Sequence, residues 1–194
     1  MIFNQRVYSV LVVSSVQKFN DTMTAMLPET DYDPVCFVSN IGAARRELLR
    51  RNYDFIIINT PLPDDFGTRF AVDVCSQSNA VVLLLVRAEM YAAANAKAGP
   101  QGVFILLKPT ASQTFQQALN WMASARERLR RMEKKATSIE EKMEEIRLVN
   151  RAKWLLIECL KMTEEDAHHF IEKQAMDRCI SRKEVATGII KTYS

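Results

Sequence analysis

Five short apolar runs, separated by helix-like segments, constrain this chain more than any other feature of its sequence. The runs are VYSVLVV, PVCFV, DFIIIN, AVVLLLV and GVFILL, and they lie between residue 7 and about residue 120. Continuous apolar runs are typical of parallel strands, because helices cover both faces of such a sheet. Their alternation with amphipathic segments such as IGAARRELLRRN predicts a doubly wound α/β domain of the flavodoxin-like kind.

Composition narrows the class of protein further. The 194 residues are 48% hydrophobic, which suffices for one ordinary core and a small second domain. The formal net charge of +3 lies in the last third, because residues 1–124 hold ten basic and ten acidic side chains. No window reaches roughly 18 uninterrupted apolar residues, and MIFNQRVYSVLVV lacks the pattern of a secretion signal. We therefore expect a cytoplasmic protein that neither enters nor crosses a membrane.

The cysteines and histidines do not form a metal-binding pattern. The four cysteines are scattered without the spacing of a disulfide framework or a zinc site, so we expect reduced core thiols at Cys36, Cys75, Cys159 and Cys179. His168 and His169 are adjacent and point in different helical directions, so they are interpreted as helix-surface residues. We expect neither a metal nor a cofactor.

Residues 112–150 contain no Gly or Pro and predict one long helix. Its apolar positions recur at alternating intervals of four and three, which is the heptad pattern of a coiled coil. The predicted dimer seam comprises Leu129, Met132, Ala136, Ile139, Met143, Ile146 and Asn150. A buried Asn and two attractive charge pairs of three favour a parallel, two-stranded homodimer. Alternatively the seam packs against the chain's own terminal helices, and the first turns, residues 118–125, cover the sheet.

Two further helices follow the long one. Thr163-Glu-Glu-Asp166 and Ser181-Arg-Lys-Glu184 each place a hydroxyl three residues before a carboxylate, which is a signature of a helix start. The predicted helices run from about 164 to 178 and from about 182 to 193. The chain is thus divided into an α/β domain (1–122), a coiled-coil helix (123–150) and a terminal three-helix module (151–194).

The stretch YDFIIINTPLPDDFG, residues 53–67, resembles the receiver domain of response regulators, and the resemblance extends over roughly residues 7–122. Tyr53, Asp54, Pro63 and Gly67 fit the family pattern, while Asn59 stands where the family has its phosphoacceptor Asp. A carboxamide cannot form an acyl phosphate. The resemblance therefore implies a receiver fold without phosphorelay chemistry, a pseudo-receiver.

Other positions of the implied phosphoacceptor pocket support this interpretation. Ser14 and Ser15 replace the two acids that hold magnesium in the family, and Val86 is assigned to the position of its switch hydroxyl. Only Lys108, followed by Pro109, keeps the family pattern. The neighbouring Asp64 and Asp65 are interpreted as solvated turn residues, with displaced metal ligands as the alternative. The cleft at the strand ends could still bind a protein or a small molecule.

Residues 149–193 resemble the ANTAR domain. The matching features are Ala152-Lys153 with the apolar residues after them, the Thr163 cap, Ala175, Val185-Ala186 and Ile189-Ile190. The resemblance implies binding of paired RNA hairpins in a nascent leader, which prevents a terminator from forming. The expected RNA-binding residues are Arg151, Lys153, Arg178, Ser181, Arg182 and Lys183. Each cation taken singly could equally be a solvated surface charge, and Trp154 is either a stacking surface or a partly buried packing residue.

These observations favour a regulator over an enzyme, because no GxSxG, P-loop or GxGxxG motif is present. We expect a homodimeric transcription antitermination regulator that binds RNA hairpins and is controlled by a regulatory protein or ligand. A DNA-binding transcriptional regulator is the alternative, since capped short helices resemble a helix-turn-helix. A protein-interaction scaffold is the third.

Overall fold

The computed structural model describes residues 6–193. The chain forms two compact units, Met1–Arg130 and Arg131–Ser194, and the boundary between them falls inside a long helix. Each unit has its own hydrophobic core. Within the described residues no helix combines the length and the apolar character needed to cross a bilayer.

The first unit is built on a five-stranded parallel sheet, as the apolar runs predict. The strands are β1 (Tyr8–Val13), β2 (Tyr32–Val38), β3 (Phe55–Asn59), β4 (Val81–Arg87) and β5 (Phe104–Lys108). Their order in the sheet is β2-β1-β3-β4-β5. The chain therefore reverses its winding direction between β1 and β3, and a crevice opens at the carboxyl ends of strands at such a point. This confirms the doubly wound fold.

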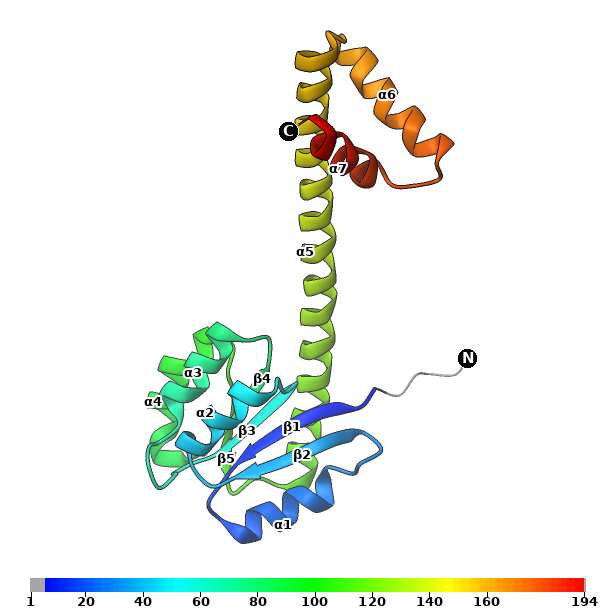
Figure 1. Ribbon diagram of the computed structural model, residues 1–194. Coiled ribbons are helices and arrows are strands. Elements are labelled where there is room, and N and C mark those ends of the chain that lie inside the picture. Colours follow the sequence, from blue (N-terminus) through cyan, green and yellow to red (C-terminus); the bar gives the residue numbers. More distant parts are fainter. Residues whose placement is uncertain (1–5, 194) are drawn as a thin grey trace. The chain divides into compact units, whose positions relative to one another are not determined.

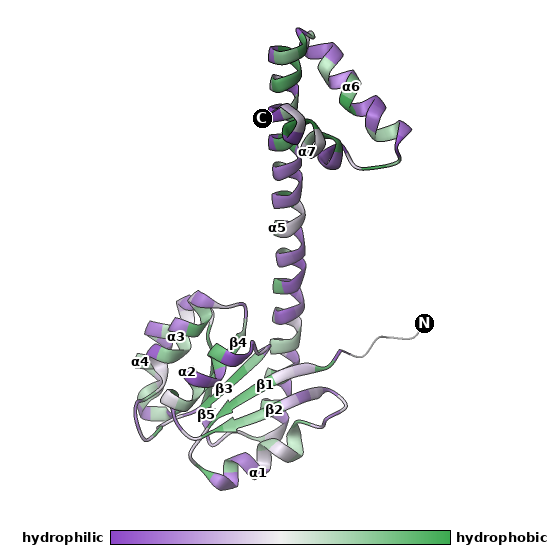
Figure 2. Cartoon of the chain, viewed as in Figure 1, coloured by the Kyte–Doolittle hydropathy of each residue, from purple (hydrophilic) through white to green (hydrophobic). Residues whose placement is uncertain are grey.

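Helices cover both faces of the sheet (Figure 1). One face packs against α2 (Ile41–Arg50), α3 (Thr68–Gln77) and α4 (Ala88–Ala98). The other packs against α1 (Gln17–Met26) and the first turns of α5 (Ser112–Leu160), which bury Phe115, Leu119 and Met122. Figure 2 shows the strands as the most continuously apolar part of this unit. Residues 118–125 thus cover the sheet as its last helix.

Two acidic loop residues act as backbone hydrogen-bond acceptors. Asp64 accepts from the amides of Ile41 and Gly42 at 3.1 and 3.0 Å, at the N-terminus of α2. These bonds lower the pKa of its carboxyl despite the opposing effect of desolvation. Asp65 accepts from the amide of Gly67 at 2.9 Å. Asp64 is exposed in a loop, as expected of a solvated turn residue, and its carboxylate in addition caps a helix that lies earlier in the chain.

An ion-pair cluster attaches α5 to the start of the sheet. Asp54 accepts from Arg126 Nε at 2.8 Å and from Arg130 Nη2 at 2.7 Å. Ser9 adds its amide and hydroxyl to the same carboxylate, and Glu127 binds both Arg130 and Arg6. The side chains of Asp54, Arg126 and Arg130 are only 13–24% exposed. Asp54 therefore ties the part of α5 that belongs to the first unit to the beginnings of β1 and β3.

The second unit consists of the end of α5 with α6 (Glu164–Asp177) and α7 (Arg182–Tyr193), in agreement with the predicted helices. Both predicted caps are formed: Thr163 Oγ1 accepts from the Asp166 amide at 3.1 Å, and Ser181 Oγ from the Glu184 amide at 3.2 Å. Glu184 in turn accepts from the Ser181 amide at 2.9 Å, which completes a capping box. The core of the unit includes Ala152, Leu156, Ala167, Ile171, Ala175, Val185, Ala186 and Ile189.

The cysteines depart from their predicted burial. Cys36 and Cys75 are half-buried, and burial raises the pKa of the Cys75 thiol. Cys159 and Cys179 are exposed, so the prediction of core thiols is wrong for these two. Cys159 lies near the end of α5 and Cys179 lies in the turn after α6 with a φ of 49°, positions that the helical stripe does not bury.

The apolar seam of α5 divides into two parts. Leu129 is half-buried and packs against the core of the first unit. Met132, Ile139, Met143 and Ile146 are more than half exposed, at 52–59%. Ala136 and Asn150 are exposed as well. The seam from Met132 to Ile146 is therefore left largely uncovered by the single chain.

Candidate functional site

The first candidate site lies at the carboxyl ends of the parallel strands. Asn59, the last residue of β3, is buried, and its two amide atoms are both engaged. Oδ1 accepts from Lys108 Nζ at 2.7 Å, and Nδ2 donates to Ser14 Oγ at 3.0 Å. Lys108 also donates to the backbone carbonyl of Thr60. The structure thus brings Ser14, Asn59 and Lys108 into one hydrogen-bonded cluster.

Two other residues expected in this cluster lie elsewhere. Ser15 is exposed and forms no part of the hydrogen bonds just described. Val86 is 2% exposed and packs in the apolar core on the α2–α4 face, so it does not line the pocket. The next residue, Arg87, lines it instead. Because side chains alternate between the faces of a strand, an assignment that is one residue off places the wrong side chain at the site.

The cluster does not suit a magnesium ion. Ser14 and Asn59 supply neutral oxygen atoms, and the Asn59 oxygen already accepts from an ammonium group. The described residues contain no group of three His, Cys, Asp or Glu side chains that could hold a metal. Mg²⁺ binds through carboxylates and waters, so a cationic Lys108 beside a carboxamide opposes it. Burial and then the charge of Arg87 lower the pKa of Lys108, which reflects how few anionic groups surround it.

The second candidate site is a pair of adjoining hollows in the helical unit. One, of about 410 Å³, is lined by residues of α5, α6 and α7 that include Ile146, Asn150, Lys153, His168 and Arg182. The other, of about 240 Å³, is lined by Asn150, Lys153, Trp154, Ile157 and Glu164. Asn150 and Lys153 line both hollows. The structure therefore brings Lys153 and Arg182 together, and it adds Asn150 and His168 to them.

The remaining expected RNA-binding residues do not line these hollows. Arg151, Arg178 and Lys183 are exposed and lie outside them, and Ser181 caps α7. Lys153 and Arg182 already have acidic partners: Lys153 Nζ lies 3.0 Å from Glu164, and Arg182 Nε lies 3.2 Å from Glu145. The Arg182 side chain is half exposed, and a surface pair of this kind contributes about 0–1 kcal/mol, so a phosphate can replace its carboxylate at little cost. The Lys153 side chain is only 17% exposed.

Trp154 is the most exposed aromatic side chain described in this unit, at 70%. The expectation of a partly buried packing residue is therefore wrong. Ala152 and Leu156 are buried on the core side of α5, and Trp154 lies two positions from each, about 200° around the helix. Helical periodicity alone could have revealed this exposure. An exposed indole beside a lysine offers a stacking surface for a base.

Comparison with known proteins identifies the second unit. A family model described as the ANTAR domain matches residues 137–190. The transcriptional regulatory protein PdtaR of Mycobacterium tuberculosis is 27% identical over 139 residues, which cover 72% of this chain and 68% of PdtaR. The match to the family model thus covers the end of α5, all of α6 and most of α7.

Solved structures identify the fold of the first unit. The signal receiver domain of an HD domain-containing protein from Pseudomonas fluorescens Pf-5 matches with a TM-score of 0.58 at 20% identity, over 68% of this chain and 96% of that one. The signal receiver domain of a histidine kinase from Syntrophus aciditrophicus matches with a TM-score of 0.53 at 20% identity, over 60% and 90%. The chain therefore joins a receiver fold to a region that matches the ANTAR domain.

Proposed function

We propose that the chain is a transcription antitermination regulator that binds paired hairpins in nascent leader RNA as a dimer. The observation that carries this proposal is the ANTAR match, which covers a folded three-helix unit. The similarity to a transcriptional regulatory protein supports it. A regulatory role also agrees with a strand-end cluster that contains no nucleophile and general base in contact.

The adjoining hollows supply groups suited to an RNA loop. Lys153 and Arg182 are cations that can contact phosphates, and the Asn150 amide can donate to and accept from a base edge. Trp154 is exposed beside them and can stack on an unpaired base. Val185, Ala186 and Ile189 of α7 are buried in the core of the second unit, so this face of the helix cannot read a DNA groove.

Dimerisation is proposed through the exposed part of the α5 seam, from Met132 to Ile146. Four large apolar side chains there are more than half exposed along one stripe, an arrangement that a second copy would bury. In a parallel pair Arg128 faces Glu133 and Lys135 faces Glu140 of the second copy, whereas Lys142 and Arg147 repel. Charge complementarity therefore favours a second copy of this chain in register.

Control is proposed to be independent of phosphorylation at residue 59. Asn59 has no carboxylate to accept a phosphoryl group, and its amide is held by Ser14 and Lys108. Acetyl phosphate with Mg²⁺ should leave the intact mass of the chain unchanged. A stable phosphoryl adduct at residue 59 would overturn this part of the proposal. The input then comes from a ligand or a partner protein that binds the first unit.

The RNA proposal is tested by titrating the full chain with an RNA that carries two tandem stem-loops. Trp154→Ala should weaken binding by about 5- to 150-fold, which corresponds to the stacking of one base. Lys153→Gln should weaken it and flatten its salt dependence by about one phosphate contact. Lys173→Gln, an exposed α6 lysine outside both hollows, is the matched control.

Three results of this titration would contradict the RNA proposal. Equal affinity for a scrambled hairpin would show that the chain does not select paired loops. Tighter binding to duplex DNA would favour a DNA-binding regulator instead. Unchanged binding by the Trp154 and Lys153 variants would show that the hollows are not the interface.

The dimer proposal is tested by sedimentation of the full chain. Ile139→Glu places a charge in the seam and should shift the protein toward monomer. Ser138→Glu adds the same side chain one residue away, off the seam, and should leave the dimer intact. A monomeric parent chain, or an Ile139→Glu variant that sediments like the parent, would refute the seam.

A further inference from the structure

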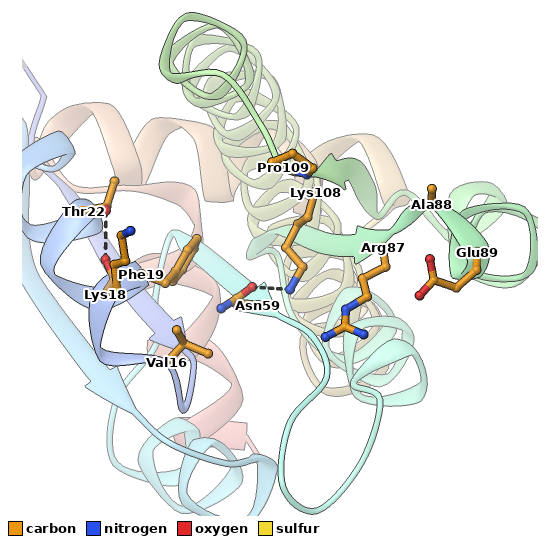
Figure 3. Close-up of a pocket in the computed structure, with 10 residues that line it drawn as sticks. All are labelled: Val16, Lys18, Phe19, Thr22, Asn59, Arg87, Ala88, Glu89, Lys108 and Pro109. Atoms are coloured by element: carbon orange, nitrogen blue, oxygen red, sulfur yellow. Dashed lines mark hydrogen bonds between the residues drawn. The ribbon is translucent and has the colours of Figure 1, made fainter.

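The crevice beside Asn59 opens into a cavity of about 600 Å³, a size found in binding sites for small molecules. Its walls come from the N-terminus of α1, the end of β3, the junction of β4 with α4, and the end of β5. Figure 3 shows Lys108 reaching toward Asn59, with Arg87 extending beside it and Phe19 on the opposite side of Asn59. The cavity lies entirely within the first unit.

The charge lining this cavity is positive. Lys18, Arg87 and Lys108 line it, against the single carboxylate of Glu89. Within residues 6–193, none of these three cations has an ion-pair partner, although Lys108 donates to the neutral oxygens of Asn59 and Thr60. Arg87 in particular leaves its guanidinium available, and a guanidinium matches the geometry of an oxyanion with two parallel hydrogen bonds.

Backbone groups add to this preference for an anion. α1 and α4 both begin at the cavity, with Val16 and Arg87 as their N-caps, and neither helix has a side-chain hydrogen bond to its first-turn amides. The free amides at a helix N-terminus favour a negative group. Burial lowers the pKa of the Lys108 ammonium group, and an anion beside it would stabilise its charged form.

The rest of the wall is apolar, formed by Val16, Phe19 and Pro109. A cavity with excess positive charge on one part and an aromatic ring on another suits a molecule that has both an oxyanion and a carbon skeleton. We propose that this cavity binds a phosphate monoester of small-molecule size. Its phosphate lies between Arg87 and Lys108 and its organic part against Phe19 and Pro109.

The charge balance selects a phosphate monoester over a carboxylate. Three cations and one carboxylate leave two positive charges, which the dianion of a phosphate monoester neutralises and a carboxylate does not. Such a ligand would be the input of the proposed phosphorylation-independent regulator, and to that extent the inference rests on the proposed function. Binding itself requires neither RNA nor a dimer, so failure of the RNA assay leaves this test informative.

The test is calorimetric titration of the full chain, without RNA, using phenyl phosphate as the probe. Binding should be saturable, and it should weaken about tenfold in Arg87→Gln and in Lys108→Gln, which each remove one charged hydrogen-bond donor. Arg69→Gln, an exposed α3 arginine outside the cavity, should bind as the parent does. Circular dichroism checks that each variant is folded. Because Arg87 is exposed, Arg87→Gln tests the proposed binding site even if Lys108→Gln unfolds.

Three further probes separate the contributions of charge and carbon skeleton. Inorganic phosphate should bind more weakly than phenyl phosphate, and phenol should not bind. Benzoate should bind more weakly as well. No saturable binding of phenyl phosphate at millimolar concentration, or no loss of affinity in Arg87→Gln, overturns the site. Equal affinity for inorganic phosphate overturns the role of the apolar wall, and tighter binding of benzoate overturns the assignment to phosphate monoesters.

Discussion

Replacing Asp54 should destabilise the first unit by removing the acceptor that holds α5 to the sheet. Breaking a buried ion pair from one side costs about 3–5 kcal/mol, because the partner charge stays buried. Here the Asp54, Arg126 and Arg130 side chains are 13%, 14% and 24% exposed, and Arg130 keeps Glu127 at 2.9 Å. We therefore expect Asp54→Asn to lower the free energy of unfolding by about 2 kcal/mol, below the range for full burial.

Urea unfolding of the full chain measures this loss. A Trp154→Phe background leaves Trp121 as the sole tryptophan, which reports on the first unit. The midpoint should fall by about 1 M urea in Asp54→Asn. Asp73→Asn is the matched control, because its partner Arg45 is 52% exposed, and it should change stability by less than about 1 kcal/mol.

The acid dependence of Asp54 follows from the same contacts. Desolvation alone would raise the pKa of its carboxyl, but the Arg126 hydrogen bond, the Ser9 amide and the arginine charges outweigh it and lower the pKa below 3.8. The stabilisation is therefore present above the unfolded-state pKa and is lost as the pH falls below about 4 toward the folded-state pKa. The difference between parent and Asp54→Asn should shrink over that range. A difference that is constant with pH, or a cycle with Arg126→Met that shows no coupling, would refute the reasoning.

Three further predictions concern the other parts of the chain. Ile171→Ala removes a fully buried side chain from the second unit and should lower the free energy of unfolding by about 2–5 kcal/mol. Urea unfolding with Trp154 as the sole tryptophan measures this loss. Met176→Ala, on the exposed side of the same helix, should lower it far less. Thr163→Ala removes the α6 cap and should cost about 1 kcal/mol in the same assay; no change would mean that the cap contributes nothing. Asn59→Asp alone should remain unlabelled by acetyl phosphate with Mg²⁺, because Ser14, the residue in contact with residue 59, supplies no carboxylate. Labelling should require Ser14→Asp in addition, and labelling of the single variant would contradict this.

The strands and helices could be predicted from the sequence because their signals are local. A continuous apolar run such as FIIIN indicates a strand buried on both faces wherever it occurs. The hydroxyl and carboxylate of a capping box lie three residues apart, so the starts of α6 and α7 are determined by a few neighbouring side chains. The same periodicity correctly places Ala167, Ile171 and Ala175 in the core of the second unit.

Contacts between distant residues were decided by the tertiary structure. Asp54 meets Arg126 and Arg130 across 72 and 76 residues, and nothing in a local pattern pairs one carboxylate with those two arginines among the many available. Asp64 caps α2 from 22 residues further along the chain, and no local pattern predicts this contact either. Charged side chains are long and have many potential partners, so which ones meet depends on how the strands and helices pack.

The residues that line the strand-end cavity show most clearly what the sequence could not predict. The sequence by itself determined that residue 59 is an amide and that Ser14 and Lys108 lie at the carboxyl ends of predicted strands. Only the fold showed that Arg87, and not Val86, faces the cavity, since a shift of one residue along a strand turns a side chain from the site into the core. Only the fold also placed three cations from three separate segments around one space. Local periodicity specifies which residues are buried, whereas the charge of a cavity depends on segments that packing brings together.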